Sequence, residues 1–121
     1  MTEEISKLAM KMCEILDNKK GEDIMLINVA EQTIVADCMI IVTGKSNALC
    51  KALCDDLDQK MEQIGVRLIR KDGYNEGRWI AMDFGGIIVH IFRDEERTFY
   101  HLEKLWSNSD NTVIYQSGGV G

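Results

Sequence analysis

A two-stranded hairpin is encoded in one stretch of this sequence, Trp79-Ile80-Ala81-Met82-Asp83-Phe84-Gly85-Gly86-Ile87-Ile88-Val89-His90-Ile91-Phe92. Two-residue hairpin turns favour glycine, so Gly85-Gly86 predicts the turn. Because side chains alternate between the two faces of a strand, Ile80 then lies opposite Ile91, and Met82 opposite Val89. One face of the hairpin is therefore wholly apolar and is predicted to lie in a core.

The other face of the predicted hairpin has a mixed composition. It carries Trp79 opposite Phe92, Ala81 opposite His90 and Asp83 opposite Ile88. An exposed tryptophan beside an acid and an imidazole is typical of a protein-binding surface, since tryptophan is enriched among the residues that dominate interface energies. In the alternative interpretation a helix covers this face, and Asp83 and His90 are hydrogen-bonded beneath it.

Helices and strands alternate along the rest of the chain. Apolar residues at helical spacing predict helices over residues 2–20 and 46–65, with Thr2 and Ser46 as N-caps, and Asp94 or Glu95 opens a last helix that ends near Trp106. Apolar runs predict strands over residues 24–29, 38–43 and 66–70. Together with the hairpin they predict an α/β fold, a mixed five-stranded sheet with helices packed on it.

The last predicted helix is rich in large apolar and aromatic residues. Much of this surface is expected to belong to the core, while the polar tips of Tyr100 and Trp106 favour an interface position. The chain of 121 residues fits one domain, over residues 1–107. Residues 108–121 have one short apolar patch and end in glycines, so they are predicted to form a flexible C-terminal tail.

Composition narrows the classes of partner. Fourteen basic and twenty acidic residues give a net charge of −6, which disfavours direct, sequence-specific nucleic-acid binding and favours basic partners. No apolar run approaches the roughly 18 residues that a membrane-spanning helix needs, and the acidic start Met1-Thr2-Glu3-Glu4 is unlike a targeting peptide. A cytoplasmic protein without a membrane partner is expected. Its four cysteines are predicted to be buried, reduced thiols rather than metal ligands.

The turn Thr43-Gly44-Lys45-Ser46 follows a predicted strand and opens a helix, as the end of a phosphate-binding loop does. The glycine that such a loop needs five residues earlier is Met39, so the simpler interpretation is a glycine turn with a serine cap. No catalytic pair, metal or cofactor is predicted. The enzymatic alternative is a nucleotidyltransferase-like enzyme or a phosphate-ester hydrolase that uses Asp83, His90 and this turn.

Three stretches resemble the ribosomal silencing factors, also called the RsfS or Iojap family. They are Asp37-Cys38-Met39-Ile40-Ile41-Val42-Thr43-Gly44-Lys45-Ser46, then Gly77-Arg78 with the hairpin quoted above, then Arg97-Thr98-Phe99-Tyr100-His101-Leu102-Glu103-Lys104-Leu105-Trp106. The likeness spans residues 3 to 107. The sequence departs from the family pattern at Cys38-Met39, where an aromatic pair is usual, at Ala48-Leu49 in place of Arg-His, and at Phe84 in place of tyrosine.

The resemblance implies a fold similar to nucleotidyltransferases without their catalytic carboxylates, and a non-enzymatic role. Family members bind protein number fourteen of the large ribosomal subunit, block joining of the small subunit and so repress translation when nutrients are short; many are homodimers when free. The binding surface that the resemblance implies comprises Trp79, Met82 and Asp83, with His90, Arg97 and Tyr100 nearby.

The family resemblance and the alternation of side chains along the strand give different positions for Met82. Alternation places Met82 on the face opposite Trp79, so either Met82 is a core residue or a bulge brings both side chains to one edge. A further possibility is that the hairpin face serves only as the interface of a homodimer.

Overall fold

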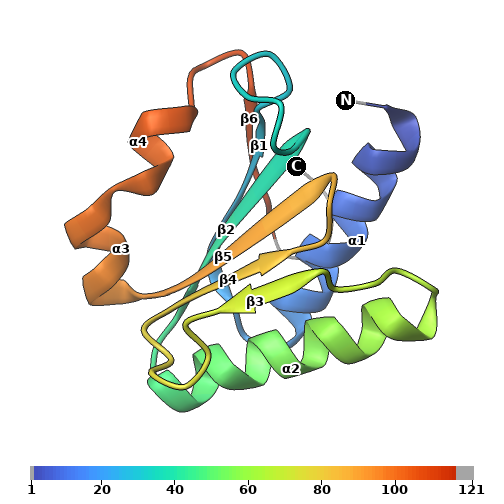
Figure 1. Cartoon of the computed structure of the whole chain (residues 1–121). Coiled ribbons are helices and arrows are strands. Elements are labelled where there is room, and N and C mark those ends of the chain that lie inside the picture. The colour runs from blue at the N-terminus through green and yellow to red at the C-terminus, as the bar shows by residue number, and fades with distance from the viewer. Residues whose placement is uncertain (1, 117–121) are drawn as a thin grey trace.

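The chain folds into a mixed β-sheet with helices on both faces (Figure 1). The computed structural model describes residues 2–116. The strands are β1 (Glu22–Asn28), β2 (Cys38–Gly44), β3 (Arg70–Asp72), β4 (Trp79–Asp83), β5 (Ile87–Arg93) and β6 (Thr112–Ile114), in the order β3-β4-β5-β2-β1-β6. The β2–β5 pair is parallel and the other four pairs are antiparallel, so the predicted mixed sheet is confirmed.

The helices divide between the two faces of the sheet. The long helices α1 (Glu3–Asn18) and α2 (Asn47–Gln63) cover one face, and the short helices α3 (Asp94–Tyr100) and α4 (Leu102–Trp106) lie on the other side (Figure 1). Both long helices begin at their predicted caps, because Thr2 Oγ1 accepts the Ile5 amide at 3.2 Å and Ser46 Oγ accepts the Leu49 amide at 2.9 Å. Among residues 2–116 no helix is long and apolar enough to cross a membrane.

Two apolar clusters join these layers. The main core packs α1 and α2 on the sheet and includes Leu16, Leu53, Ile40 and Val89. A smaller second cluster on the opposite face contains Ile27, Val29, Met39, Ile41 and Phe92. Every residue of β2 is buried, since it runs between the two clusters, which explains its continuous apolar run.

The four cysteines lie inside the protein as reduced thiols, as predicted. Burial raises the pKa of the Cys13 thiol to about 12, and the same cause raises the pKa of Cys38 and Cys54 to about 12. These side chains therefore stay protonated at neutral pH and act as small apolar packing groups.

The hairpin has the predicted register. Trp79 pairs with Phe92, Ile80 with Ile91, Ala81 with His90, Met82 with Val89 and Asp83 with Ile88. Ile80, Met82, Val89 and Ile91 are each 0% exposed in the main core, so the prediction of a wholly apolar inner face is confirmed.

The sheet has six strands where the sequence analysis predicts five. The additional strand, β6, comes from the segment predicted as a flexible tail, and it pairs with β1 through Met25–Ile114 and Ile27–Thr112. Asn111 anchors it, because its Nδ2 donates to the carbonyl oxygens of Asn28 at 3.1 Å and Trp106 at 2.8 Å. A strand of three residues has no detectable periodicity, and side-chain bonds outside it set its position. Residues 117–121 of the predicted tail lie outside the described residues.

The third predicted strand is also displaced. The sequence analysis places it at residues 66–70, whereas β3 covers Arg70–Asp72. Its ladder partner β4 ends at Asp83, which pairs with Arg70, so residues 66–68 have no strand beside them. Val66 and Leu68 instead pack on the main core as partly buried loop residues.

The single helix predicted up to Trp106 is two helices. His101, with φ 50 and ψ 43, lies in the left-handed region and separates α3 from α4. This conformation is unfavourable for a residue other than glycine and ends the hydrogen-bond ladder of α3. No glycine or proline marks the break, so helical periodicity alone extends across it.

Two glycines offer a matched test of the loop that leads into β4. Gly73 has φ +82, and a Cβ there would lie 2.0 Å from the Trp79 carbonyl oxygen, whereas at Gly65, with φ +81, a Cβ would meet nothing within 4 Å. We expect Gly65→Ala to cost about 1 kcal/mol through its backbone conformation alone, and Gly73→Ala to cost about 3 kcal/mol or more because the loop must also move. Urea unfolding of both variants measures the difference, and equal losses would contradict a tightly packed loop.

Candidate protein-binding site

Five side chains of β4 and β5 are partly exposed on the sheet face that carries α3 and α4. We call them the open strip: Trp79, Ala81, Asp83, Ile88 and His90. Helix α3 packs against β5 and β2, and its Tyr100 lies on Trp79, yet all five residues of the strip keep part of their surface exposed. The alternative in which a helix covers the mixed face therefore holds only in part, at the Trp79 end, where His90 is hydrogen-bonded as that interpretation expects.

Trp79 is held in place by three aromatic neighbours. Its Nε1–H donates to His90 Nδ1 at 3.0 Å, and its ring centroid lies 4.8 Å from that of Phe92 and 4.8 Å from that of Tyr100. Phe92 belongs to the second cluster and supports the indole from below. The remaining exposed part of the indole thus has a defined orientation, which lowers the entropy that binding a partner would cost.

His90 is a neutral acceptor for this tryptophan. Burial lowers the pKa of the His90 imidazole from 6.5 to about 4, so the ring is uncharged at neutral pH. Since Nδ1 accepts the indole N–H, the proton of the neutral ring is assigned to Nε2. His90 therefore satisfies the polar atom of Trp79 without adding charge to the open strip.

Asp83 and Tyr100 lie at the two ends of the same surface. The Asp83 carboxylate accepts the Gly85 amide at 2.8 Å and so stabilises the hairpin turn while it stays partly exposed. In the sheet register it lies opposite Arg70 of β3. Tyr100 is 49% exposed, packs on Trp79 and contacts Phe99 edge to face at 5.0 Å.

Two residues that the resemblance assigned to the surface are not placed on it. Met82 is 0% exposed and the β4–β5 register is unbroken from Trp79 to Asp83, so no bulge turns Met82 outward. Arg97 also points inward, with only 13% of its side chain exposed. The structure thus corrects the expectation for Met82, which is a core residue, and shows that Arg97 is engaged by contacts within the protein.

Sequence reasoning missed two exposed residues on the helices of this face. Phe99 is 79% exposed on α3 and Leu105 is 72% exposed on α4, whereas Trp106, expected at an interface, is partly buried against the second cluster. The break at His101 changes the phase of the helix, so Leu105 and the other residues of α4 no longer follow the periodicity of α3. The left-handed residue carries no sequence signal that could have revealed this.

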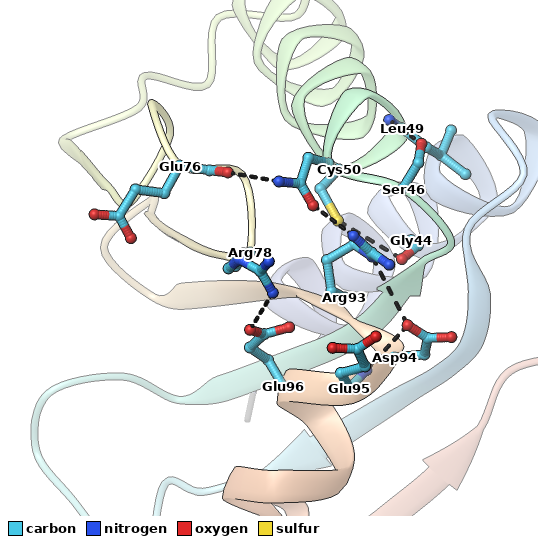
Figure 2. Close-up of polar contacts among 11 residues, drawn as sticks. Gly44, Ser46, Leu49, Cys50, Glu76, Arg78, Arg93, Asp94, Glu95 and Glu96 are labelled. Atoms are coloured by element: carbon cyan, nitrogen blue, oxygen red, sulfur yellow. Dashed lines mark hydrogen bonds and ion pairs between the residues drawn. The ribbon is translucent and has the colours of Figure 1, made fainter.

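The phosphate-loop-like turn has structural partners for both of its hydroxyl groups. Ser46 caps α2, and Thr43 Oγ1 accepts from Arg97 Nη1 at 2.9 Å. Gly44 is required for packing, since a Cβ there would lie 2.7 Å from Cys50 Sγ, and Figure 2 shows the Cys50 thiol directed at the Gly44 carbonyl. The simpler interpretation, a glycine turn followed by a serine cap, is confirmed.

A polar network beside this turn secures the start of β4 (Figure 2). Arg93 Nη1 donates to Asn47 Oδ1 at 2.6 Å, and Asn47 Nδ2 donates to the Glu76 carbonyl at 3.1 Å. Arg78, the residue before Trp79, forms a 2.9 Å ion pair with Glu96 of α3. These bonds connect α2, the loop before β4 and α3, and so hold the two elements that frame Trp79.

The fold and the open strip define the class: a small α/β domain with an exposed aromatic and acidic surface on its sheet. The family model described as ribosomal silencing factor during starvation matches residues 2–118. The chain therefore belongs to the ribosomal silencing factor family, which gives it a ribosome-associated silencing role.

Individual relatives agree with this assignment. The chain is 38% identical to ribosomal silencing factor RsfS of Haemophilus influenzae, over 79% of this chain and 94% of that protein. It is 32% identical to RsfS of Bacillus subtilis, over 87% and 86% of the two chains. A crystal structure of a protein from Chromobacterium violaceum superposes with a TM-score of 0.79 and 32% identity, covering 92% of each chain.

The depressed pKa of His90 predicts a pH dependence of stability. In the unfolded chain His90 binds a proton near pH 6.5, whereas in the folded chain it does so only near pH 4. The contribution of neutral His90 to the free energy of unfolding is therefore complete above pH 6.5 and is lost as the pH falls toward 4. Between pH 7 and pH 5 the loss is about 2 kcal/mol. His90→Gln keeps an acceptor for the indole but does not titrate, so it should lose less stability over this interval. Urea unfolding of both proteins at the two pH values measures the difference, and identical losses would contradict burial of a neutral His90.

Proposed function

We propose that this protein represses translation by binding the large ribosomal subunit through its protein number fourteen and by blocking the small subunit sterically. Family membership supports a ribosome-associated role. The observation that supports the docking surface is the partly exposed indole of Trp79, fixed by His90 and Tyr100, with the Asp83 carboxylate at the other end of the strip. In this mechanism the protein acts by occupying space and transforms nothing chemically.

The open strip has the features of an interface centre. Trp79 presents a large, oriented apolar surface, and one such residue at the centre of an interface can contribute more than about 2 kcal/mol. The exposed side chains of Phe99, Tyr100 and Leu105 extend the apolar area onto α3 and α4. We assign Trp79, Asp83, His90 and Tyr100 to the contact surface, and Met82 and Arg97 to its support.

Charge favours a basic protein as the direct contact. The net charge of −6 attracts a basic ribosomal protein and repels the phosphate backbone of ribosomal RNA, so direct sequence-specific RNA binding is not part of the proposal. Binding at the side of the large subunit that faces the small subunit would place the whole domain in the joining path. The protein would carry out this role in the cytoplasm.

Trp79→Ala tests the docking surface. The loss of about 2 kcal/mol predicts that the variant binds purified large subunits at least about thirtyfold more weakly, and that it no longer prevents joined ribosomes from forming in sucrose gradients of mixed subunits. Ile64→Ala serves as the matched control. It also removes a large apolar side chain, which is 56% exposed and lies at the end of α2. A folded Trp79→Ala protein that binds and blocks as well as the control would refute the proposed anchor.

We propose in addition that the free protein forms a homodimer through the same apolar surface. Three large apolar side chains of α3 and α4 are exposed together with Trp79, and such patches favour self-association when no other partner covers them. Light scattering should give a mass near twice the 13.7 kDa of one chain, and Trp79→Ala should lower it toward that of one chain. If the protein is a monomer at all concentrations, the proposed dimer is wrong, whereas the proposal that this surface binds the ribosome is not affected.

A further inference from the structure

Helix α3, which carries Tyr100, contributes no buried residue, and Phe99 and Tyr100 on it are exposed. Helix α4 also has no fully buried residue and packs on the second cluster only through the partly buried Leu102 and Trp106. Helices of seven and five residues are also too short to be stable alone. The contact between Tyr100 and Trp79 therefore needs another source of order.

Arg97 supplies contacts to three different elements. Its Nε–H donates to Glu103 Oε2 of α4 at 3.0 Å, and its Nη1 donates to Thr43 Oγ1 of β2 at 2.9 Å and to the Asp23 carbonyl of β1 at 2.5 Å. The guanidinium group and its carboxylate partner are both largely removed from solvent, with 13% and 16% of the side chains exposed. Charge-assisted hydrogen bonds in such a setting are stronger than those between exposed side chains.

The sheet is shaped to receive this guanidinium. The register of β1 shifts between Glu22 and Met25, and Asp23 has φ 50, so the Asp23 carbonyl leaves the strand ladder and accepts from Arg97. Thr43 is 5% exposed at the end of β2, and its hydroxyl needs a partner. Both acceptors are therefore satisfied by a residue of α3, which fixes α3 against the end of the sheet.

The Arg97–Glu103 ion pair spans the left-handed residue His101. Arg97 lies before the joint and Glu103 after it, so the pair fixes the angle between α3 and α4. A non-glycine residue keeps such a conformation only where its surroundings stabilise it. Tyr100 lies on α3 three residues after Arg97, so its ring position over Trp79 depends on the Arg97 side chain that attaches α3 to the sheet and that Glu103 orients.

We propose that Arg97 and Glu103 are positioning residues: together they form a clamp that holds Tyr100 against Trp79 and so orients the indole for its partner. This inference rests on the proposed function for its consequence in binding, but the clamp itself is a property of the free protein. It gives Arg97 a role different from the direct partner contact that the family resemblance implied. Glu103, which the resemblance did not assign to the surface, becomes part of the same unit.

The clamp is tested first in the free protein. The chain has two tryptophans, so Trp106→Phe leaves Trp79 as the sole indole reporter. In this background, Arg97→Met and Glu103→Ala should each increase acrylamide quenching of Trp79 fluorescence about twofold, because Tyr100 no longer shields the ring. Lys60→Met and Asp56→Ala, which break a 2.6 Å ion pair within α2 on the other face of the sheet, are the matched controls and should leave the quenching unchanged.

A thermodynamic cycle then separates positioning from direct contact. Arg97→Met and Glu103→Ala should each weaken binding to purified large subunits about fivefold, with a double variant no weaker than either alone, as expected for one coupled unit. In a Tyr100→Ala background neither substitution should weaken binding further. A loss for Arg97→Met that persists in that background, or that Glu103→Ala does not reproduce, would show that Arg97 contacts the partner and would overturn the clamp.

The milder variant keeps the test informative. If Arg97→Met does not fold, Glu103→Ala still breaks the ion pair while leaving the bonds of Arg97 to the sheet, and unchanged quenching of Trp79 in that variant would refute the proposal. If the unaltered protein does not bind large subunits, the proposed function fails, and the clamp is judged on the quenching measurement.

Discussion

The alternation of side chains along β4 and β5 is the constraint on which the surface depends. Burial of Ile80, Met82, Val89 and Ile91 in the main core determines which side of each strand faces inward. The intervening residues must then face the other side, where the open strip lies. A shift of one residue in register would exchange the two sets, so the apolar core specifies the binding face as strictly as it specifies the fold.

This dependence explains how much of the molecule was predictable from the sequence. The hairpin register follows from two glycines and period-two alternation, and the starts of α1 and α2 follow from Thr2 and Ser46, because each of these signals is local. The site residues Trp79, Asp83 and His90 follow from the same alternation. Their partial exposure did not follow, since it depends on how far α3 extends over the sheet.

The features that sequence reasoning missed depend on contacts between distant residues. β6 is positioned by Asn111, whose side chain bonds to Asn28 and Trp106, and no pattern within three residues carries that information. The break at His101 coincides with an ion pair between Arg97 and Glu103, and Arg97 is itself anchored on two strands. The inward position of Met82 was predictable from alternation, and it conflicts only with the assignment that came from family resemblance.

The second face of the sheet combines a smaller buried cluster with polar bonds, whereas the first depends on burial. On the first face α1 and α2 contribute several buried residues each, and the apolar side chains of these residues are buried in the main core. On the second face the Arg97–Glu103 and Arg78–Glu96 ion pairs hold α3 and α4 together with Leu102 and Trp106, and Phe99, Tyr100 and Leu105 remain exposed. The surface formed by α3 and α4 has few buried contacts and hence a lower local stability than the core. A small number of charged groups therefore determines how well this surface is ordered. The net charge of −6 complements this arrangement under the proposed function, because it opposes contact between the exposed aromatic side chains of like-charged copies and attracts a basic partner.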